Sequence, residues 1–171
     1  QLVVQELKEA KSTGTSLIRN MRAKLLLASA EVNCDGRGNR KRDEALHSAR
    51  EARELFKELK EKHLEGMALL SQAAICVKRK GETDERAQEM LKVAREAQPL
   101  FKSLNEKRGE AQTLHWVGMA FGLKEMYQDA MKAASEAKAL FRQCGDIILE
   151  ARESQILAAW NLKEQDLERA V

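Results

Sequence analysis

The sequence predicts an all-α protein in which repeated helical hairpins stack in one array. Three observations lead to this prediction. The chain of 171 residues has one proline, nine glycines and 4% aromatic residues, and 33% of its residues are charged, which is typical of helical proteins. One segment of the chain recurs at a nearly constant interval. Within each copy, apolar residues return at helical spacing.

The repeated segment aligns with itself at a shift of 45 residues. The matched residues are Leu46 with Leu91, Ala49 with Ala94, Arg50 with Arg95, Glu51 with Glu96, Ala52 with Ala97, Leu55 with Leu100, Phe56 with Phe101, Lys57 with Lys102 and Leu59 with Leu104. A further shift of 40 residues produces a third copy around Ala134, Ala137 and Phe141. Apolar positions three and four apart put Ala, Leu and Phe on one stripe, so each copy is expected to be an amphipathic helix.

The expected helices follow in order along the chain. Leu2–Lys11 is expected to be the last helix of a preceding unit, ended by Gly14. A second helical pattern precedes each of the three copies, over residues 17–32, 66–77 and 110–123, and it recurs after the last copy over residues 147–162. Turn signals separate these helices at Gly14 and at residues 35–39, 81–84, 105–109, 122–125 and 145–146. Because one hairpin cannot bury its apolar stripe alone, the units are expected to stack.

The expected domain organisation is one array over residues 1–171. It divides into the end of a preceding unit (1–14), three units (15–62, 63–107 and 108–145) and the first helix of a following unit (146–171). The chain is therefore expected to be a piece of a longer array.

A proline interrupts the second copy of the repeated segment. Pro99 stands where the first copy has Glu54 and the third has Ala139. Proline inside a helix removes a backbone hydrogen bond and costs roughly 3 kcal/mol, so the sequence predicts a kink at this position.

The third unit resembles the tetratricopeptide repeat, in which small and large residues recur at fixed positions of two antiparallel helices. The residues that carry the resemblance are Leu114, Val117, Gly118, Phe121, Ala130, Ala134 and Ala137. The second unit has a degenerate copy in Leu69, Gln72, Ala73, Cys76, Met90, Ala94 and Ala97. The first unit has another in Lys24, Leu27, Ala28, Glu31, Ala45, Ala49 and Ala52.

The resemblance covers residues 17–162 and implies a right-handed solenoid of antiparallel helix-turn-helix hairpins, a superhelix like that of tetratricopeptide repeats. The units of 40–45 residues are longer than the common 34-residue repeat, and the family's terminal proline is absent, so the chain looks like the long-unit variety. HEAT-type and 14-3-3-like packings are the alternatives, because alanine-rich helix pairs suit them as well. Gly118 and Phe121 favour the tetratricopeptide repeat.

The resemblance also implies a concave groove formed by the first helix of each unit. The residues expected to face this groove are Arg22, Leu25, Ser29, Asn33, Met67, Leu70, Ala74, Lys78, Gln112, His115, Met119, Arg152, Gln155 and Lys163, with Trp116 and Ala159 beside them. Such a surface would suit an extended or helical peptide with some acidic character. The carboxylate clamp of the family has Lys and Asn where this chain has Leu25 and Ser29, so recognition of a terminal carboxylate is not expected.

No pattern of catalytic or metal-binding residues stands out. His47, His63 and His115 lie apart in the sequence and have no neighbours that indicate a triad or a metal pair. Residues 35–39 contain Gly-x-Gly, but they lack both the alternating acidic ligands of a calcium loop and the preceding strand of a dinucleotide site. No catalytic residues, metal, cofactor or small-molecule substrate are therefore predicted.

The charge pattern indicates the class of binding partner, and the cysteines indicate the cellular compartment. The formal net charge is only +3, and both signs alternate along the chain, which argues against nucleic acid as the partner. The three cysteines form no Cys-x-x-Cys pair, so the cytoplasm or another reducing intracellular compartment is expected, an organelle included. No apolar run approaches the roughly 20 residues of a membrane span.

These observations predict a non-catalytic scaffold that binds a protein or peptide partner through the concave groove. A structural subunit or docking module of a larger multiprotein assembly is the first alternative. An RNA-binding helical repeat and a regulatory domain of a larger enzyme are the others.

Overall fold

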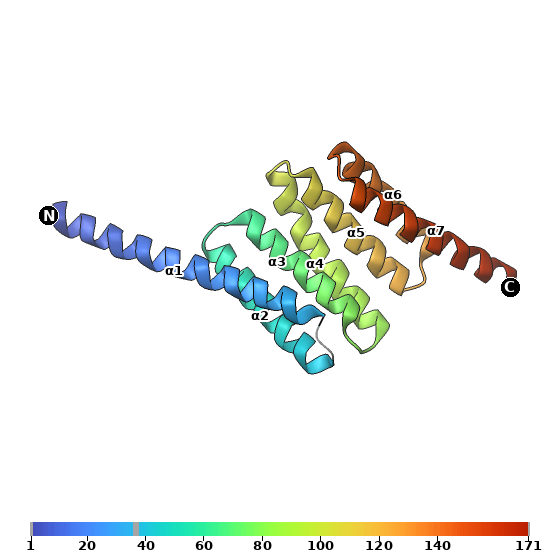
Figure 1. Ribbon diagram of the computed structural model, residues 1–171, viewed down its shortest axis with the longest axis horizontal. Helices are drawn as coiled ribbons and strands as arrows, with labels where there is room; N and C mark the ends of the chain where they lie inside the picture. Colours follow the sequence, from blue (N-terminus) through green and yellow to red (C-terminus); the bar gives the residue numbers. More distant parts are fainter. Residues whose placement is uncertain (1, 36–37, 171) are drawn as a thin grey trace.

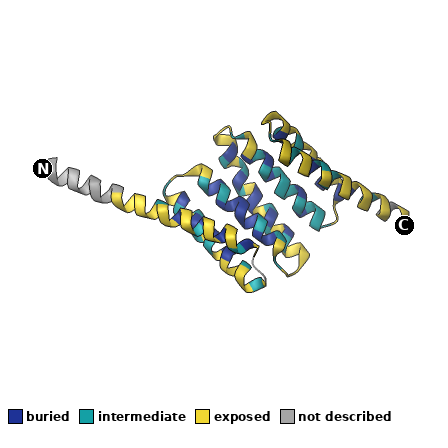
Figure 2. Ribbon diagram, in the orientation of Figure 1, coloured by how far each residue is buried: buried dark blue, intermediate teal, exposed yellow. Residues whose placement is uncertain are grey.

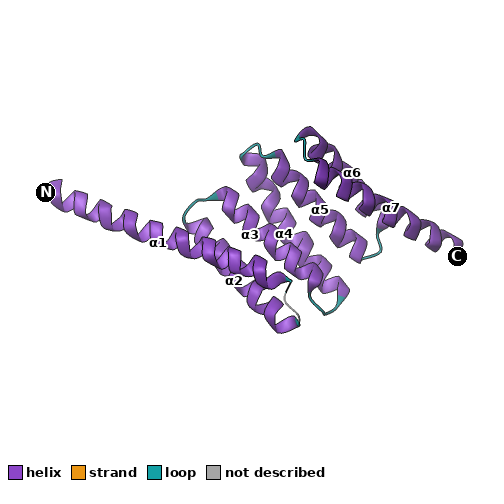
Figure 3. Ribbon diagram, viewed as in Figure 1, coloured by secondary structure: helices purple, strands orange, loops and turns teal. Residues whose placement is uncertain are grey.

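The computed structural model describes the backbone of residues 2–35 and 38–170 and the side chains of residues 14–35, 38–166 and 169. Over these ranges the chain forms helices and turns and no strand, so the predicted all-α class is confirmed (Figure 3). The helices are α1 (Leu2–Cys34), α2 (Asn39–Glu58), α3 (Lys62–Lys78), α4 (Thr83–Ser103), α5 (Lys107–Leu123), α6 (Tyr127–Gln143) and α7 (Ile147–Ala170).

Each helix packs against the next one in the sequence, so the helices lie in order from one end of the molecule to the other (Figure 1). Direct contacts also join α1 to α3 and α3 to α5. Ion pairs Arg50–Glu89 and Arg53–Glu96 join α2 to α4. The first helices of successive hairpins are therefore neighbours in space, and the packing of helices in adjacent pairs is confirmed.

The repeated segment supplies much of the core (Figure 2). Its buried residues are Ala49, Ala52 and Phe56 in α2, Ala94, Ala97 and Phe101 in α4, and Ala134, Ala137 and Phe141 in α6. Alanine at these positions lets the backbones of neighbouring helices approach closely, and each phenylalanine fills the space near the end of its helix. The same short sequence therefore makes the same packing element three times.

Four helices end in one backbone motif. The residues after α2, α4, α5 and α6 that adopt positive φ are Lys60, Asn105, Glu125 and Gly145. In each case the next amide donates a hydrogen bond to the carbonyl of a phenylalanine five residues earlier, as in Glu61 to Phe56 at 2.9 Å and Asp146 to Phe141 at 3.0 Å. This is the pattern of a Schellman cap, which satisfies carbonyls at a helix end.

Three glycines that were expected in turns lie inside helices, and they are Gly14, Gly109 and Gly122. The chain does turn next to the last two, at residues 104–106 and 124–126. Gly14 is within α1, which runs without interruption from Leu2 to Cys34, so the predicted turn there is wrong. One glycine weakens a helix by about 1 kcal/mol but does not end it when the flanking residues continue the pattern. Gly122 is within α5, and a Cβ atom at this position would lie 2.8 Å from the indole ring of Trp160. Its role is close packing rather than chain reversal.

Helix α4 continues through Pro99, whose side chain is exposed. The proline therefore does not end the helix. Arg95, whose carbonyl has no amide partner at Pro99, is also exposed, so water can satisfy this carbonyl. The kink at Pro99 stays a prediction.

The structure corrects the alignment of the first unit by one residue. Lys24, Ala28 and Glu31 were expected at packing positions, but all three are exposed. Leu27 is buried as expected, and Ala23 and Ala30 are buried in place of Lys24 and Glu31. Loop length does not explain this offset, because the loop after α3 and the loop after α1 both span four residues. The predicted turn in the loop after α1 includes Gly36 and Arg37, which lie outside the described residues.

Candidate partner-binding surface

A pocket of about 240 Å³ lies where α1, α3 and α5 meet. Its lining comes from three first helices, and the residues are Glu31, Cys34 and Asp35 at the end of α1, Met67, Leu70, Ser71, Ala74 and Lys78 in α3, and Gln112 and Trp116 in α5. Residues four apart on α3 share one helix face, which explains how α3 contributes a continuous wall. We call this the α1–α3–α5 pocket.

The α1–α3–α5 pocket has an apolar wall. Leu70 is 5% exposed, and Met67 and Trp116 are partly buried against the same core cluster. The Trp116 ring is also held edge-on by His115, with ring centroids 4.8 Å apart. A large apolar surface fixed by its neighbours, yet open on one side, can receive an apolar side chain from a partner.

The rim of the pocket is polar and carries an ion pair between Lys78 and Asp35. The Lys78 ammonium donates a hydrogen bond to Asp35, which lowers the pKa of the Asp35 carboxyl and raises the pKa of Lys78. Glu31 lies beside this pair, is exposed, and has no ion-pair partner in the described part of the chain. The rim therefore carries more negative than positive charge, which does not favour the acidic peptide expected from the sequence.

The cysteines near this surface are not activated. Burial raises the pKa of the Cys34 thiol, and it raises that of Cys76 to about 11. A thiol with a raised pKa is a poor nucleophile at neutral pH. Among the described residues, no three His, Cys, Asp or Glu side chains are grouped as metal ligands would be. What the pocket offers is shape, apolar contact and charge.

The structure brings together five of the residues expected in the groove. Met67, Leu70, Ala74, Lys78 and Gln112 all line the α1–α3–α5 pocket, and Trp116, expected beside the groove, lines it too. The pocket also contains Glu31, Cys34, Asp35 and Ser71, which the sequence reasoning did not select. The corrected alignment of α1 explains part of this difference, because it moves Glu31 from a packing position to the surface.

The expected residues of α1 lie elsewhere. Arg22, Leu25 and Ser29 line a separate surface of α1 with Ile18, Met21 and Leu26. Arg22 forms an ion pair with Glu51 of α2, and Asn33 donates a hydrogen bond to Ser29 at 3.3 Å. These residues do not contribute to the α1–α3–α5 pocket.

The remaining expected residues are tied to other contacts or lie apart. His115 Nδ1 lies 2.6 Å from the carboxylate of Glu153, and Met119 packs against two core clusters. Lys163 lies over the Tyr127 ring at 5.9 Å, while Arg152, Gln155 and Ala159 are exposed on α7. The structure does not place these residues in one pocket with the α3 residues.

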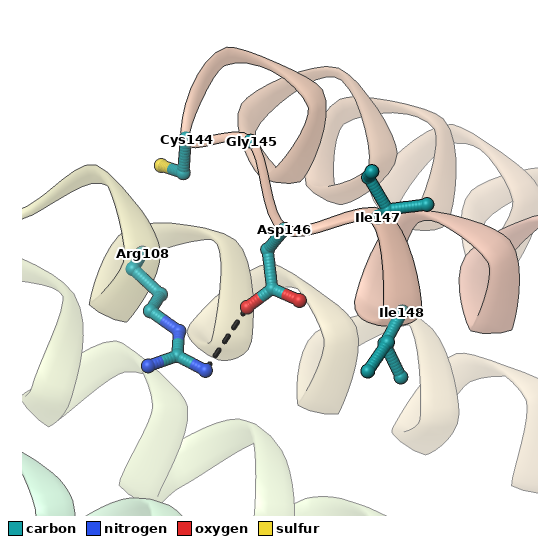
Figure 4. Close-up of a pocket in the computed structure, with 6 residues that line it drawn as sticks. All are labelled: Arg108, Cys144, Gly145, Asp146, Ile147 and Ile148. Carbon is teal, nitrogen blue, oxygen red and sulfur yellow. Dashed lines mark ion pairs between the residues drawn. The ribbon is translucent and has the colours of Figure 1, made fainter.

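A second pocket lies at the turn between α6 and α7 (Figure 4). Arg108 and Asp146 face each other across it at 3.0 Å, and Ile147 and Ile148 stand at the start of α7. Asp146 also accepts a hydrogen bond from the backbone amide of Leu149, so it caps α7. These polar groups already have structural partners, which leaves the α1–α3–α5 pocket as the better candidate.

The sequence matches no protein-family model and no curated protein. Among the described residues, no helix is both long enough and apolar enough to cross a membrane. The α1–α3–α5 pocket and its chemistry are therefore the features that indicate a function.

Proposed function

We propose that this chain is a non-catalytic interaction module, a right-handed solenoid like that of tetratricopeptide repeats, which binds a peptide segment of another protein in the α1–α3–α5 pocket. The observation that carries the proposal is the position of this pocket. Three first helices from successive hairpins line it, which is where the resemblance implies the concave ligand-binding surface.

The chemistry of the pocket defines the kind of peptide. The apolar wall of Met67, Leu70 and Trp116 suits one large apolar side chain. The Gln112 amide can donate to and accept from a peptide backbone. Because Lys78 is already paired with Asp35 and Glu31 is not paired, a neutral or basic residue beside the apolar anchor fits better than an acidic one.

The proposal is tested by selecting ligands from a phage-displayed library of random peptides and measuring their affinity by fluorescence polarisation. Ala74→Arg places a long side chain into the pocket from its partly exposed wall. We expect selected peptides to contain a large apolar residue and to bind this variant about tenfold more weakly or worse, as when a central contact is lost.

Two variants serve as controls. Ala139→Arg makes the same substitution at an exposed position of α6, and Leu25→Glu changes an exposed position of α1 outside the pocket. Both should bind the peptides as the unchanged chain does. Peptides that bind Ala74→Arg with unchanged affinity, or a library that yields no ligand, would show that the pocket is not the binding site.

A further inference from the structure

Helix α1 has two apolar faces, and only one of them is covered. Ala23, Leu27, Ala30 and Cys34 are buried against the rest of the protein. On the opposite side of the helix, apolar residues follow one another at alternating steps of three and four. These residues, which we call the α1 end stripe, are Ile18, Met21, Leu25, Ala28 and Val32. The four larger side chains are between 57% (Met21) and 78% (Val32) exposed.

Helix α1 is the first helix in the stack, and much of its described length is exposed (Figures 1 and 2). Ile18, Met21 and Leu25 border a shallow hollow of about 470 Å³ whose surface is almost wholly apolar. Alternating steps of three and four are the spacing of a helix that pairs with another helix along its length. An apolar stripe of this length is a surface at which a protein associates.

We propose that the α1 end stripe binds the same stripe of a second copy of this chain, with the two α1 helices antiparallel about a twofold axis. The five residues of the α1 end stripe lie outside the α1–α3–α5 pocket, although Glu31, which flanks the stripe, also lines the pocket. The dimer does not depend on the peptide-binding proposal. The charges beside the stripe complement those of a second copy.

Lys24 and Glu31 flank the stripe on one side, both are exposed, and neither forms an ion pair with another described residue. In an antiparallel pair, Leu25 can face Ala28 of the second copy while Met21 faces Val32 of the second copy. This register places Lys24 beside Glu31 of the second copy, and the twofold axis repeats the contact. The same register also packs the large Leu25 side chain against the small Ala28 of the second copy at the centre of the interface.

Other arrangements lose this complementarity. Sliding the antiparallel helices by one heptad in one direction puts Lys24 beside Lys24 of the second copy, and in the other direction it puts Glu31 beside Glu31 of the second copy. A parallel pair would place Lys24 beside Ser29 of the second copy and would form no opposite-charge contact. The charges therefore favour one register and disfavour its neighbours.

The other end of the stack offers a weaker match. Its outer face on α7 has the same spacing in Ile148, Ala151, Gln155, Ala158 and Leu162. The centre of this face is the polar Gln155. Its flanks carry Ser154 and Asn161 at the positions that correspond to Lys24 and Glu31 in α1. A dimer that pairs α7 with α7, or α1 with α7, therefore does not form the reciprocal charge pairs.

The test measures the mass of the chain by sedimentation equilibrium at protein concentrations up to roughly 1 mM, a range in which even a weak interface associates. Leu25→Glu is compared with Leu162→Glu, which makes the same change at an exposed leucine of α7. We expect a dimer that Leu25→Glu abolishes and Leu162→Glu leaves intact. Circular dichroism should show that both variants stay folded, because both leucines are exposed.

Charge reversal tests the register. Lys24→Glu alone and Glu31→Lys alone should each raise the dimer dissociation constant by about tenfold, because each turns two attractive pairs into repulsive ones. The double variant Lys24→Glu with Glu31→Lys should restore the original value.

Four results would overturn the proposal. They are a chain that stays monomeric at every concentration, a dimer that Leu25→Glu does not weaken, association that Leu162→Glu abolishes, and single reversals that the double variant does not rescue.

Discussion

The backbone conformation of four turn residues shows how single side chains fit the repeat. Gly145 and Asn105 are residues that tolerate positive φ, whereas Lys60 and Glu125 have φ of 59° and do not favour it. All four serve the same Schellman cap after a phenylalanine-containing helix end. Packing of the helices on either side therefore imposes a strained conformation on Lys60 and Glu125.

Glu125→Gly should raise the free energy of unfolding by about 1 kcal/mol, because glycine adopts positive φ without a Cβ clash. Urea denaturation followed by circular dichroism measures the change. Gly145→Ala, at the matching position after α6 with φ 71°, should lower the free energy of unfolding by a similar amount. If Glu125→Gly lowers the free energy of unfolding instead, the Glu125 side chain stabilises the protein by more than its positive φ costs.

At the scale of the element, Phe101 determines how α4 fits between its neighbours. This ring is fully buried and lies against two glycines, Gly66 of α3 and Gly109 of α5. A Cβ atom at Gly66 would lie 2.6 Å from Cζ of Phe101, and one at Gly109 would overlap the ring. The glycines allow both flanking helices to approach the ring closely, which explains why they lie within helices despite their low propensity.

Gly109→Ala should destabilise the protein by about 1–3 kcal/mol, since the added methyl group has no space beside Phe101. Thermal and urea unfolding measure the loss. Gly14→Ala is the matched control, because Gly14 is also helical but a Cβ atom there meets nothing within 4 Å. The control should be stabilised by roughly 0.5–1 kcal/mol through helix propensity. If both substitutions stabilise the protein, the close contact with Phe101 does not limit stability.

At the scale of the whole molecule, contacts between helices far apart in the sequence join the hairpins to one another. Two of them are His–Glu pairs of almost equal length, His63 with Glu106 at 2.7 Å and His115 with Glu153 at 2.6 Å. Their surroundings differ, because the Glu153 side chain is 1% exposed whereas Glu106 is 31% exposed. Oε2 of Glu153 also has no hydrogen-bond partner in the described part of the chain.

His115→Ala should destabilise the protein by about 3–5 kcal/mol, because it removes the partner of a buried carboxylate that joins α7 to α5. His63→Ala should cost less than about 1 kcal/mol, because water can replace the histidine beside Glu106. Urea denaturation of the two variants makes the comparison. Equal losses would mean that burial of Glu153 does not determine the strength of this contact.

The periodicity and composition of the sequence were sufficient to predict most of the helices. The alanine and phenylalanine positions of the repeated segment identified α2, α4 and α6, and the intervening patterns identified α3, α5 and most of α7. The reason is local, because spacing of three and four residues puts side chains on one face whatever lies opposite. The groove implied by the resemblance was placed on α3 with the same spacing, and Met67, Leu70, Ala74 and Lys78 line one pocket. Their role in binding a partner stays a prediction.

Relations between distant segments could not be read in this way. The one-residue error on α1, the packing of Gly122 against Trp160, the turn at Lys60 and the pairing of Lys78 with Asp35 all depend on which helices meet. By itself, the sequence determined the all-α class, the hairpin repeat and the buried faces of α2, α4 and α6, because these follow from local spacing. Only the tertiary structure decided the register of α1, the pocket it completes with α3 and α5, and the end stripe it leaves open, because these depend on helix-to-helix contacts.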